Sequence, residues 1–199
     1  MSCNAYGFTA PKGGLDRMYD WFMDAPVGGK FAVYGDDTCL VFKRPDGVYR
    51  VDPDFQQMDG SLNQQDIQLT VRWMAKIVAK EAGEEMPAFW HAVCKQWVEM
   101  ACDPMFVLDG KTVYKKKQPH GMMSGVPGTT MFDTVKSALA WNLYLQMSKQ
   151  KGKDPLDGSW ATSFMLDMGL VIKPGTWEPA RIPDKIVGNL LTDHKFLGV

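Results

Sequence analysis

Apolar and polar residues follow two different periods in the first quarter of the chain. In residues 14–24 the apolar side chains recur every three or four positions, which predicts a short amphipathic helix. Apolar runs at 31–34 and 39–42 flank the letters "GDD", a pattern that predicts two strands joined by a tight turn. The stretch "DGVYRVDPDF" predicts a third strand with Pro53 near its end. This part of the chain therefore predicts an antiparallel sheet.

The pattern becomes mainly helical after residue 60. The letters "SLNQ" fit a capping box with Ser61 as the cap and Gln64 as its partner, opening a helix to about residue 82. A second helix is predicted up to residue 102, with Pro87 in its first turn. The other predicted elements are a hairpin turning at "LDGK", a helix from the Gly-rich loop "GMMSGVPGTT" to about residue 147, a helix at "SWATSFMLDMGL", and short strands at "LVIK" and "KFLGV". Together these patterns predict one α/β (α+β) domain in which helices cover an antiparallel sheet.

Composition narrows the class of protein. The 199 residues are 45% hydrophobic and 23% charged, which suits one well-buried core. A net charge of −1 gives no global basic footprint, so any contact with nucleic acid must come from a local patch. No apolar run approaches the ~18 residues of a membrane span, and the N-terminus lacks a signal-peptide layout. We expect a soluble cytoplasmic protein whose four separated cysteines are reduced thiols and whose seven tryptophans mostly pack in the core.

The most unusual chemistry is the pair of adjacent acids, Asp36 and Asp37, at the predicted hairpin tip. A solvated acidic turn is one explanation, because Gly-Asp suits a tight turn. The other is a cation site, since Asp54 ends a predicted strand and Asp59 follows just before a helix. Carboxylate-only ligation suits Mg²⁺ or Mn²⁺, and two such ions ~4 Å apart can activate a hydroxyl and stabilise a leaving phosphate oxygen.

Three stretches together resemble the palm subdomain of viral RNA-dependent RNA polymerases, which has an RRM-like or ferredoxin-like core. "YGDD" (34–37) resembles motif C, "DFQQMDGSL" (54–62) motif A, and the loop and helix start at 121–133 motif B. The likeness extends more weakly to motif D (about 165–175) and motif E (about 194–199). The order C–A–B is similar to that of the permuted polymerases of permutotetraviruses and birnaviruses, and the GDD form is closer to the first group.

The resemblance implies roles for particular residues. Asp36, Asp37 and Asp54 would hold two Mg²⁺ or Mn²⁺ ions and act in catalysis, with the Phe55 carbonyl as a further ligand. Asp59 would sense the ribose 2′-OH, which favours RNA synthesis over reverse transcription. The residues implied in shaping the nucleotide loop are Ser124, Gly125, Thr129 and Thr130.

Three further positions fit the family pattern less closely. Asp133 stands where the family usually has Asn, and two carboxylates cannot pair unless one is protonated or a cation lies between them. Asn63, one turn after Asp59, is a candidate for the missing amide. Lys173 is the motif D candidate for the general acid that protonates pyrophosphate, although its offset from "MGL" differs from the family's.

The expected partners are RNA template, primer and NTPs. Lys115, Lys116 and Lys117 form the only dense basic run, which is either a solvated hairpin or a contact to the RNA backbone. No fingers motif F and no thumb are evident. The alternative function is therefore an excised or catalytically weak palm that self-associates or binds RNA. As a viral protein it is expected in the host cell cytoplasm, with virion association as a further possibility.

Overall fold

The computed structural model describes residues 14–84, 88–115, 121–123, 125 and 128–184. A four-stranded antiparallel sheet runs in the order β1-β2-β3-β6, and a separate hairpin pairs β4 with β5. The strands are β1 (Lys30–Tyr34), β2 (Asp37–Arg44), β3 (Gly47–Val51), β4 (Met105–Val107), β5 (Val113–Lys115) and β6 (Ala180–Ile182). The helices are α1 (Gly14–Met23), α2 (Met58–Ser61), α3 (Gln64–Ala82), α4 (Ala88–Cys102), α5 (Thr129–Lys151) and α6 (Gly158–Asp167). The predicted α+β class is confirmed.

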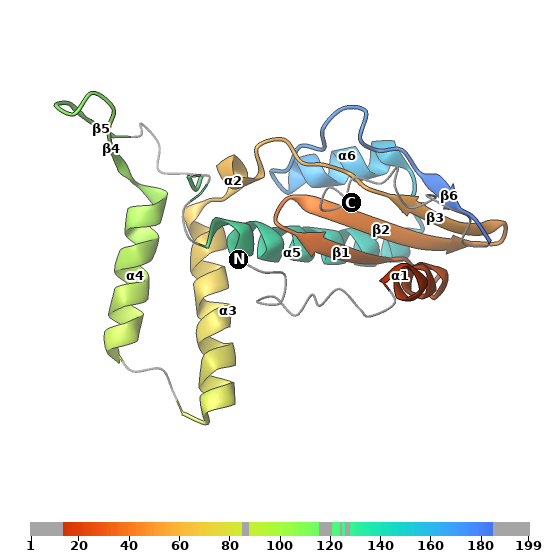
Figure 1. Ribbon diagram of the computed structural model, residues 1–199, viewed down its shortest axis with the longest axis horizontal. Coiled ribbons are helices and arrows are strands. Elements are labelled where there is room, and N and C mark those ends of the chain that lie inside the picture. The colour runs from red at the N-terminus through yellow and green to blue at the C-terminus, as the bar shows by residue number, and fades with distance from the viewer. Residues whose placement is uncertain (1–13, 85–87, 116–120, 124, 126–127, 185–199) are drawn as a thin grey trace.

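Alternating side chains of β2 divide the core between the two faces of the sheet. Leu40 and Phe42 pack with residues of α5 and α6, including the fully buried Trp141. Val41 points to the opposite face and packs against α1 through Phe22. Since a strand's side chains alternate between faces, one eight-residue strand supports both layers. Figure 1 shows α5 and α6 along the sheet and α1 near the end where β2 turns into β3.

A third cluster ties an arm of two helices to this body. Ile67 of α3 and Val98 of α4 are buried together with Phe132 of α5. Beyond that cluster α3 and α4 extend away from the sheet side by side (Figure 1). Within the described residues, no helix combines the length and hydropathy that a membrane crossing requires.

Several predictions of local structure need correction. The cap of α3 is Asn63, whose side chain accepts from the Asp66 N–H while Asp66 accepts from the Asn63 N–H, so the predicted Ser61–Gln64 box is wrong. Ser61 instead ends α2, and its hydroxyl donates to the Met58 carbonyl. "LVIK" makes only an isolated bridge between Ile172 and Phe55.

The predictions for the last strand, the cysteines and the tryptophans compare differently with the structure. The strand β6 lies where none was predicted and pairs with β3. Pro87 and the segment "KFLGV" lie outside the described residues. Of the described cysteines, Cys39, Cys94 and Cys102, none forms a disulfide. The tryptophan prediction is wrong for Trp73 and Trp90, each of which is 52% exposed.

Candidate active site

The adjacent acids lie at the tip of the β1–β2 hairpin. Tyr34 pairs with Asp37, so Gly35 and Asp36 form a two-residue turn. Gly35 has φ +64°, a left-handed conformation that favours glycine, and an added Cβ would lie 3.5 Å from a Thr130 methyl. The sequence "YGDD" therefore folds as a turn because its glycine accepts this backbone, and the turn places the two acids next to each other at the strand ends.

Helix α5 holds this turn through polar side chains that the sequence reading missed. The Gly35 N–H donates to Thr134 Oγ1 at 2.7 Å, and Ser137 Oγ donates to the Gly35 carbonyl at 3.0 Å. One turn further on, Trp141 Nε1 donates to Thr38 Oγ1 at 2.9 Å. These three helix residues are spaced by three and four, so they share one face of α5. Their contacts fix the acidic tip against a rigid element.

Asp54 lies against the same hairpin, although β3 ends at Val51, so the prediction that Asp54 ends a strand is wrong. An isolated antiparallel bridge pairs Asp37 with Asp54. The next residue, Phe55, is buried, and its ring stacks on Trp141 with centroids 5.5 Å apart. Trp141 thus contacts both stretches, donating a hydrogen bond to one and stacking on the other. The backbone brings two of the three proposed metal-binding acids together, although they are 17 positions apart in the sequence.

Lys173 reaches this site from the segment after α6. Its N–H donates to the Asp54 carbonyl at 2.7 Å, and its ammonium Nζ lies 2.9 Å from Asp54 Oδ2. Thr176 Oγ1 accepts from the Asp54 N–H. The hydrogen bond and charge of Asp54, with a smaller contribution from Asp36, raise the pKa of Lys173. Lys173 is therefore a cation held on a proposed metal-binding carboxylate.

Asp59 and Asp133 lie close enough for their charges to interact. Asp133 on α5 is buried, its Oδ1 has no hydrogen-bond partner, and burial raises its pKa to about 7, with help from the charges of Asp59 and Asp36. Lys136 lowers this pKa, but its ammonium bonds the Ser61 carbonyl and Asp66 Oδ2 instead. Asp133 is thus a buried acid with a destabilised charge.

The other residues predicted for the site make local contacts or lie away from the acidic tip. Asn63 caps α3 through its Oδ1, and Thr129 Oγ1 donates to the Met123 carbonyl. The Thr130 carbonyl accepts from Thr134, and Gly125 has φ +82°. Ser124, Lys116 and Lys117 lie outside the described residues. Lys115 pairs with Asp103 at 2.8 Å, in the β4–β5 hairpin beyond α4 and away from the acidic tip (Figure 1).

The carboxylates of the candidate site can be compared with the ligands that a divalent cation requires. Asp36, Asp37 and Asp54 offer only hard oxygen ligands, and the Lys173 ammonium already neutralises one of them. As placed, the side chains of the described residues form no group of three or more His, Cys, Asp or Glu that could hold a metal ion. The chemistry of the donors and the backbone pairing fit such an ion, and the ligand set stays a prediction.

An antiparallel sheet backed by helices, with two acids at a hairpin tip and a third bridged to it, is the arrangement that the palm motifs predict. The sequence model of the permutotetravirus RNA-dependent RNA polymerase palm domain matches residues 1–199. The chain therefore belongs to this family. No curated protein matches the chain.

Proposed function

We propose that this palm domain catalyses nucleotidyl transfer from an NTP to the 3′ end of an RNA. The observation that carries the proposal is the bridge between Asp37 and Asp54 at the tip that α5 holds. Asp36, Asp37 and Asp54 would hold two Mg²⁺ or Mn²⁺ ions, with the Phe55 carbonyl as a further ligand. Bound there, the ions would activate the 3′-hydroxyl and stabilise charge on the phosphates.

The chain's own residues then have distinct roles. Thr134, Ser137 and Trp141 position the acidic tip. Lys173 is proposed as the group that gives a proton to the departing pyrophosphate, because its ammonium lies beside the Asp54 carboxylate. With a cation held at Asp54, the Lys173 ammonium would lose its carboxylate partner and could contact the pyrophosphate.

Ribose selection is proposed for Asp59 and Asp133, with the motif B loop shaping the nucleotide site. Asp59 is fixed because its carbonyl accepts from the Met122 N–H at 2.8 Å. A protonated Asp133 can donate a hydrogen bond as an amide would. The capping contact of Asn63 leaves Asp133 as the better candidate for the amide-like partner.

The direct test of this function is a nucleotide addition assay. The purified chain is incubated with Mn²⁺, NTPs and a primed RNA template, and the products are resolved by length. Template-dependent addition of ribonucleotides is the expected result. Incorporation that ignores template sequence, or that prefers deoxyribonucleotides, would contradict the proposal. We expect the activity to belong to a viral replication protein of the host cytoplasm, with virion association as a separate question.

A second candidate, an excised or weakly active palm that self-associates or binds RNA, is favoured by one observation. The α3–α4 arm exposes large apolar side chains, among them Leu69, Phe89 and Met100 at 56%, 68% and 65%. Exposed apolar area of this kind commonly marks an interaction surface. This candidate predicts RNA binding or dimerisation without nucleotide addition in the same assay.

Replacing Asp133 with asparagine is expected to stabilise the protein above neutral pH. With a folded pKa of about 7, Asp133 keeps its proton in the folded state over a pH range where the unfolded chain has lost it, from about 4 to 7. The free energy of unfolding therefore falls as pH rises through this window. Asp133→Asn carries no such charge, so its advantage over the wild type should grow by about 2–3 kcal/mol between pH 5 and pH 8.

Chemical denaturation at pH 5 and pH 8 measures this difference. The matched control is Asp24→Asn, because the Asp24 side chain is 96% exposed and should show no pH-dependent gain. An Asp133→Asn protein that is less stable than the wild type at pH 8 would contradict this prediction, because it would mean that neighbouring groups stabilise the buried carboxylate.

A further inference from the structure

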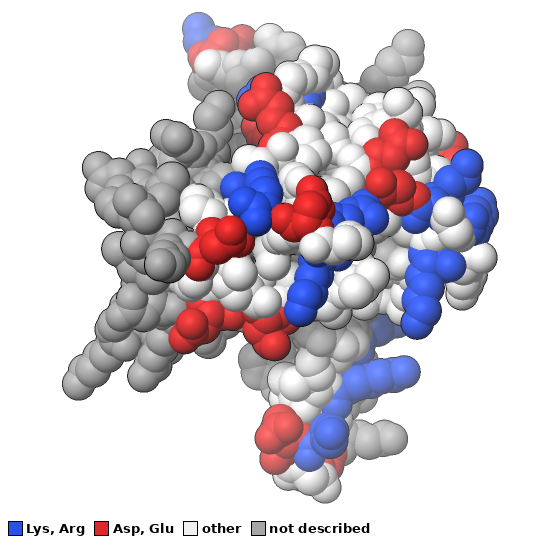
Figure 2. All heavy atoms as spheres, turned by 90° about the vertical axis from the view of Figure 1, so that its right-hand side faces the viewer, with Lys and Arg blue, Asp and Glu red and all other residues white. Residues whose placement is uncertain are grey.

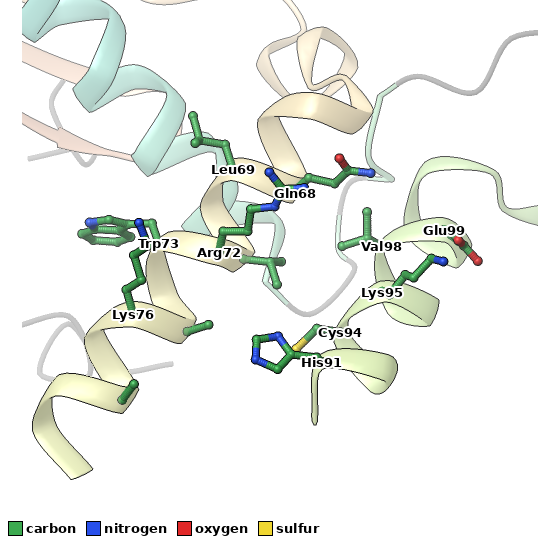
Figure 3. Close-up of a pocket in the computed structure, with 13 residues that line it drawn as sticks. Gln68, Leu69, Arg72, Trp73, Lys76, His91, Cys94, Lys95, Val98 and Glu99 are labelled. Carbon is green, nitrogen blue, oxygen red and sulfur yellow. The ribbon is translucent and has the colours of Figure 1, made fainter. Parts of the chain in front are cut away.

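A groove runs between α3 and α4, outside the acidic site. It has a volume of about 810 Å³, in the range of roughly 300–1,000 Å³ typical of ligand pockets. Val71 and Val98 provide apolar lining, and Arg72, Lys76 and Lys95 add positive charge. Figure 3 shows Arg72 and Lys76 extending from α3 and Lys95 from α4. We call this feature the α3–α4 groove; its lining is mainly apolar and cationic, with one acid, Glu99, one turn after Lys95 on α4.

The cations that α3 contributes to the groove have no acid beside them on their own helix. Arg72 and Lys76 continue with Lys80 at intervals of four, so the three lie along one side of α3, and residues 67–80 contain no acid. None of them, and not Lys95, takes part in an ion pair within the described part of the chain. By contrast, acidic and basic side chains are interspersed on the face of the molecule that Figure 2 shows.

An aromatic ring lies among these charges. Trp73 lines the groove at its α3 edge and is 52% exposed; in Figure 3 it points, with Lys76, to the side of α3 turned away from α4. An exposed indole is costly to leave in water and offers a flat face for stacking. Proteins that bind single-stranded nucleic acid combine a positive groove for the backbone with aromatic side chains on which bases stack. The α3–α4 groove has both parts.

We propose that the α3–α4 groove binds single-stranded RNA, with Arg72, Lys76 and Lys95 contacting phosphates and Trp73 stacking on a base. The groove would hold a strand outside the catalytic centre and so add affinity that the acidic tip cannot supply. The choice of RNA as the physiological strand rests on the proposed function. The charge and stacking argument rests on the groove alone.

A second copy of the chain is the less favourable occupant. In a two-fold contact the same patch meets itself, so the cations of one groove would face those of the other. Lysine is also depleted from the cores of protein interfaces, because burying an unpaired ammonium is costly. The formal net charge of the chain is −1, so attraction of RNA has to come from a local cluster of cations such as this one. A polyanion therefore fits this surface better than a copy of itself.

The test measures the affinity of the full chain for a fluorescently labelled 12-nucleotide poly(U) RNA by anisotropy. The titrations are run in EDTA, so that binding is scored independently of metal-dependent catalysis and a failure of the proposed function would not affect the result. The variant Arg72→Ala/Lys76→Ala should weaken binding at least about tenfold at low salt. It should also reduce the slope of log K against log salt by about 1.4, because each phosphate contact to a single strand contributes about 0.7.

Trp73→Ala should weaken binding by about tenfold with the salt slope unchanged, because stacking involves no counterion release. Two matched controls should stay within about twofold of the wild type in affinity. Trp90→Ala removes an indole that is also 52% exposed but does not line the groove. Lys149→Ala/Lys153→Ala removes two charges near the end of α5.

Each other outcome counts against the proposal. Equal losses in the groove and control variants would mean diffuse electrostatic attraction, and no loss in either would mean that RNA binds elsewhere. A dimer in sedimentation velocity that the groove variants abolish, with RNA affinity unchanged, would make the groove an interface between copies. Circular dichroism of each variant confirms that the helices are intact.

Discussion

Asp54→Asn is expected to reduce Mn²⁺-dependent nucleotide addition by at least about 100-fold, with little change in folding. The substitution keeps the shape of the side chain and removes the charge that would attract a divalent cation. It also breaks the ion pair with Lys173, whose raised pKa depends mainly on Asp54. That pair is solvent-exposed, so its loss should cost the fold little stability. The variant should therefore lose nucleotide addition while keeping nearly the stability of the wild type.

Primer extension and chemical denaturation on the same preparations measure the two effects. Asp24→Asn serves as the control, since it removes one equally negative charge at a fully exposed position away from the hairpin tip. Titrating Mn²⁺ adds a second readout, because the variant should need a higher concentration for any residual addition. Wild-type activity in Asp54→Asn at every Mn²⁺ concentration would remove Asp54 from the metal site.

Trp141→Ala is expected to destabilise the fold by about 3–5 kcal/mol, the usual cost of emptying a fully buried tryptophan position. The milder Trp141→Phe separates packing from function. It keeps a ring to stack on Phe55 but removes the N–H that bonds Thr38, next to Asp37. A buried hydroxyl without its donor costs about 1–3 kcal/mol. Because this contact positions the acidic tip, the variant should also lose nucleotide addition at temperatures where it is fully folded.

Trp160→Phe is the matched control. Trp160 Nε1 donates to Ser148 Oγ at 2.8 Å, so the substitution removes the same kind of hydrogen bond on the far side of the α5–α6 packing. We expect it to lower stability by a similar amount and leave nucleotide addition unchanged when folded. If both variants lose activity in proportion to stability, Trp141 is a packing residue without a special role at the tip.

The hairpin and the acidic turn could be predicted because their signals are local. The alternation of apolar residues sets the strands, and Gly35 permits the turn. The hydrogen bonds by which Thr134, Ser137 and Trp141 hold the hairpin could not be predicted, since they join positions about one hundred residues apart. The sequence indicated these contacts only weakly, through three polar or amphipathic residues on one side of a predicted helix.

The errors have physical reasons. "SLNQQD" contains two overlapping capping patterns, and the charged Asp66 is a stronger partner for a backbone N–H than Gln64. The strand β6 is only three residues long between prolines, so it has no periodic pattern of its own and gains its conformation by pairing with β3. Trp73 looked like a core residue because helical spacing does not show which side of a helix lacks a neighbour.

The central claim is that the β1–β2 tip and the segment after β3 that carries Asp54 hold divalent cations together. Crystals soaked in Mn²⁺ test it directly through anomalous scattering. The account predicts anomalous peaks about 4 Å apart among the carboxylates of Asp36, Asp37 and Asp54, with the Lys173 ammonium displaced from Asp54. Peaks elsewhere, or an Asp54 carboxylate more than about 8 Å from both other acids, would contradict it, because ions so spaced could not share these ligands.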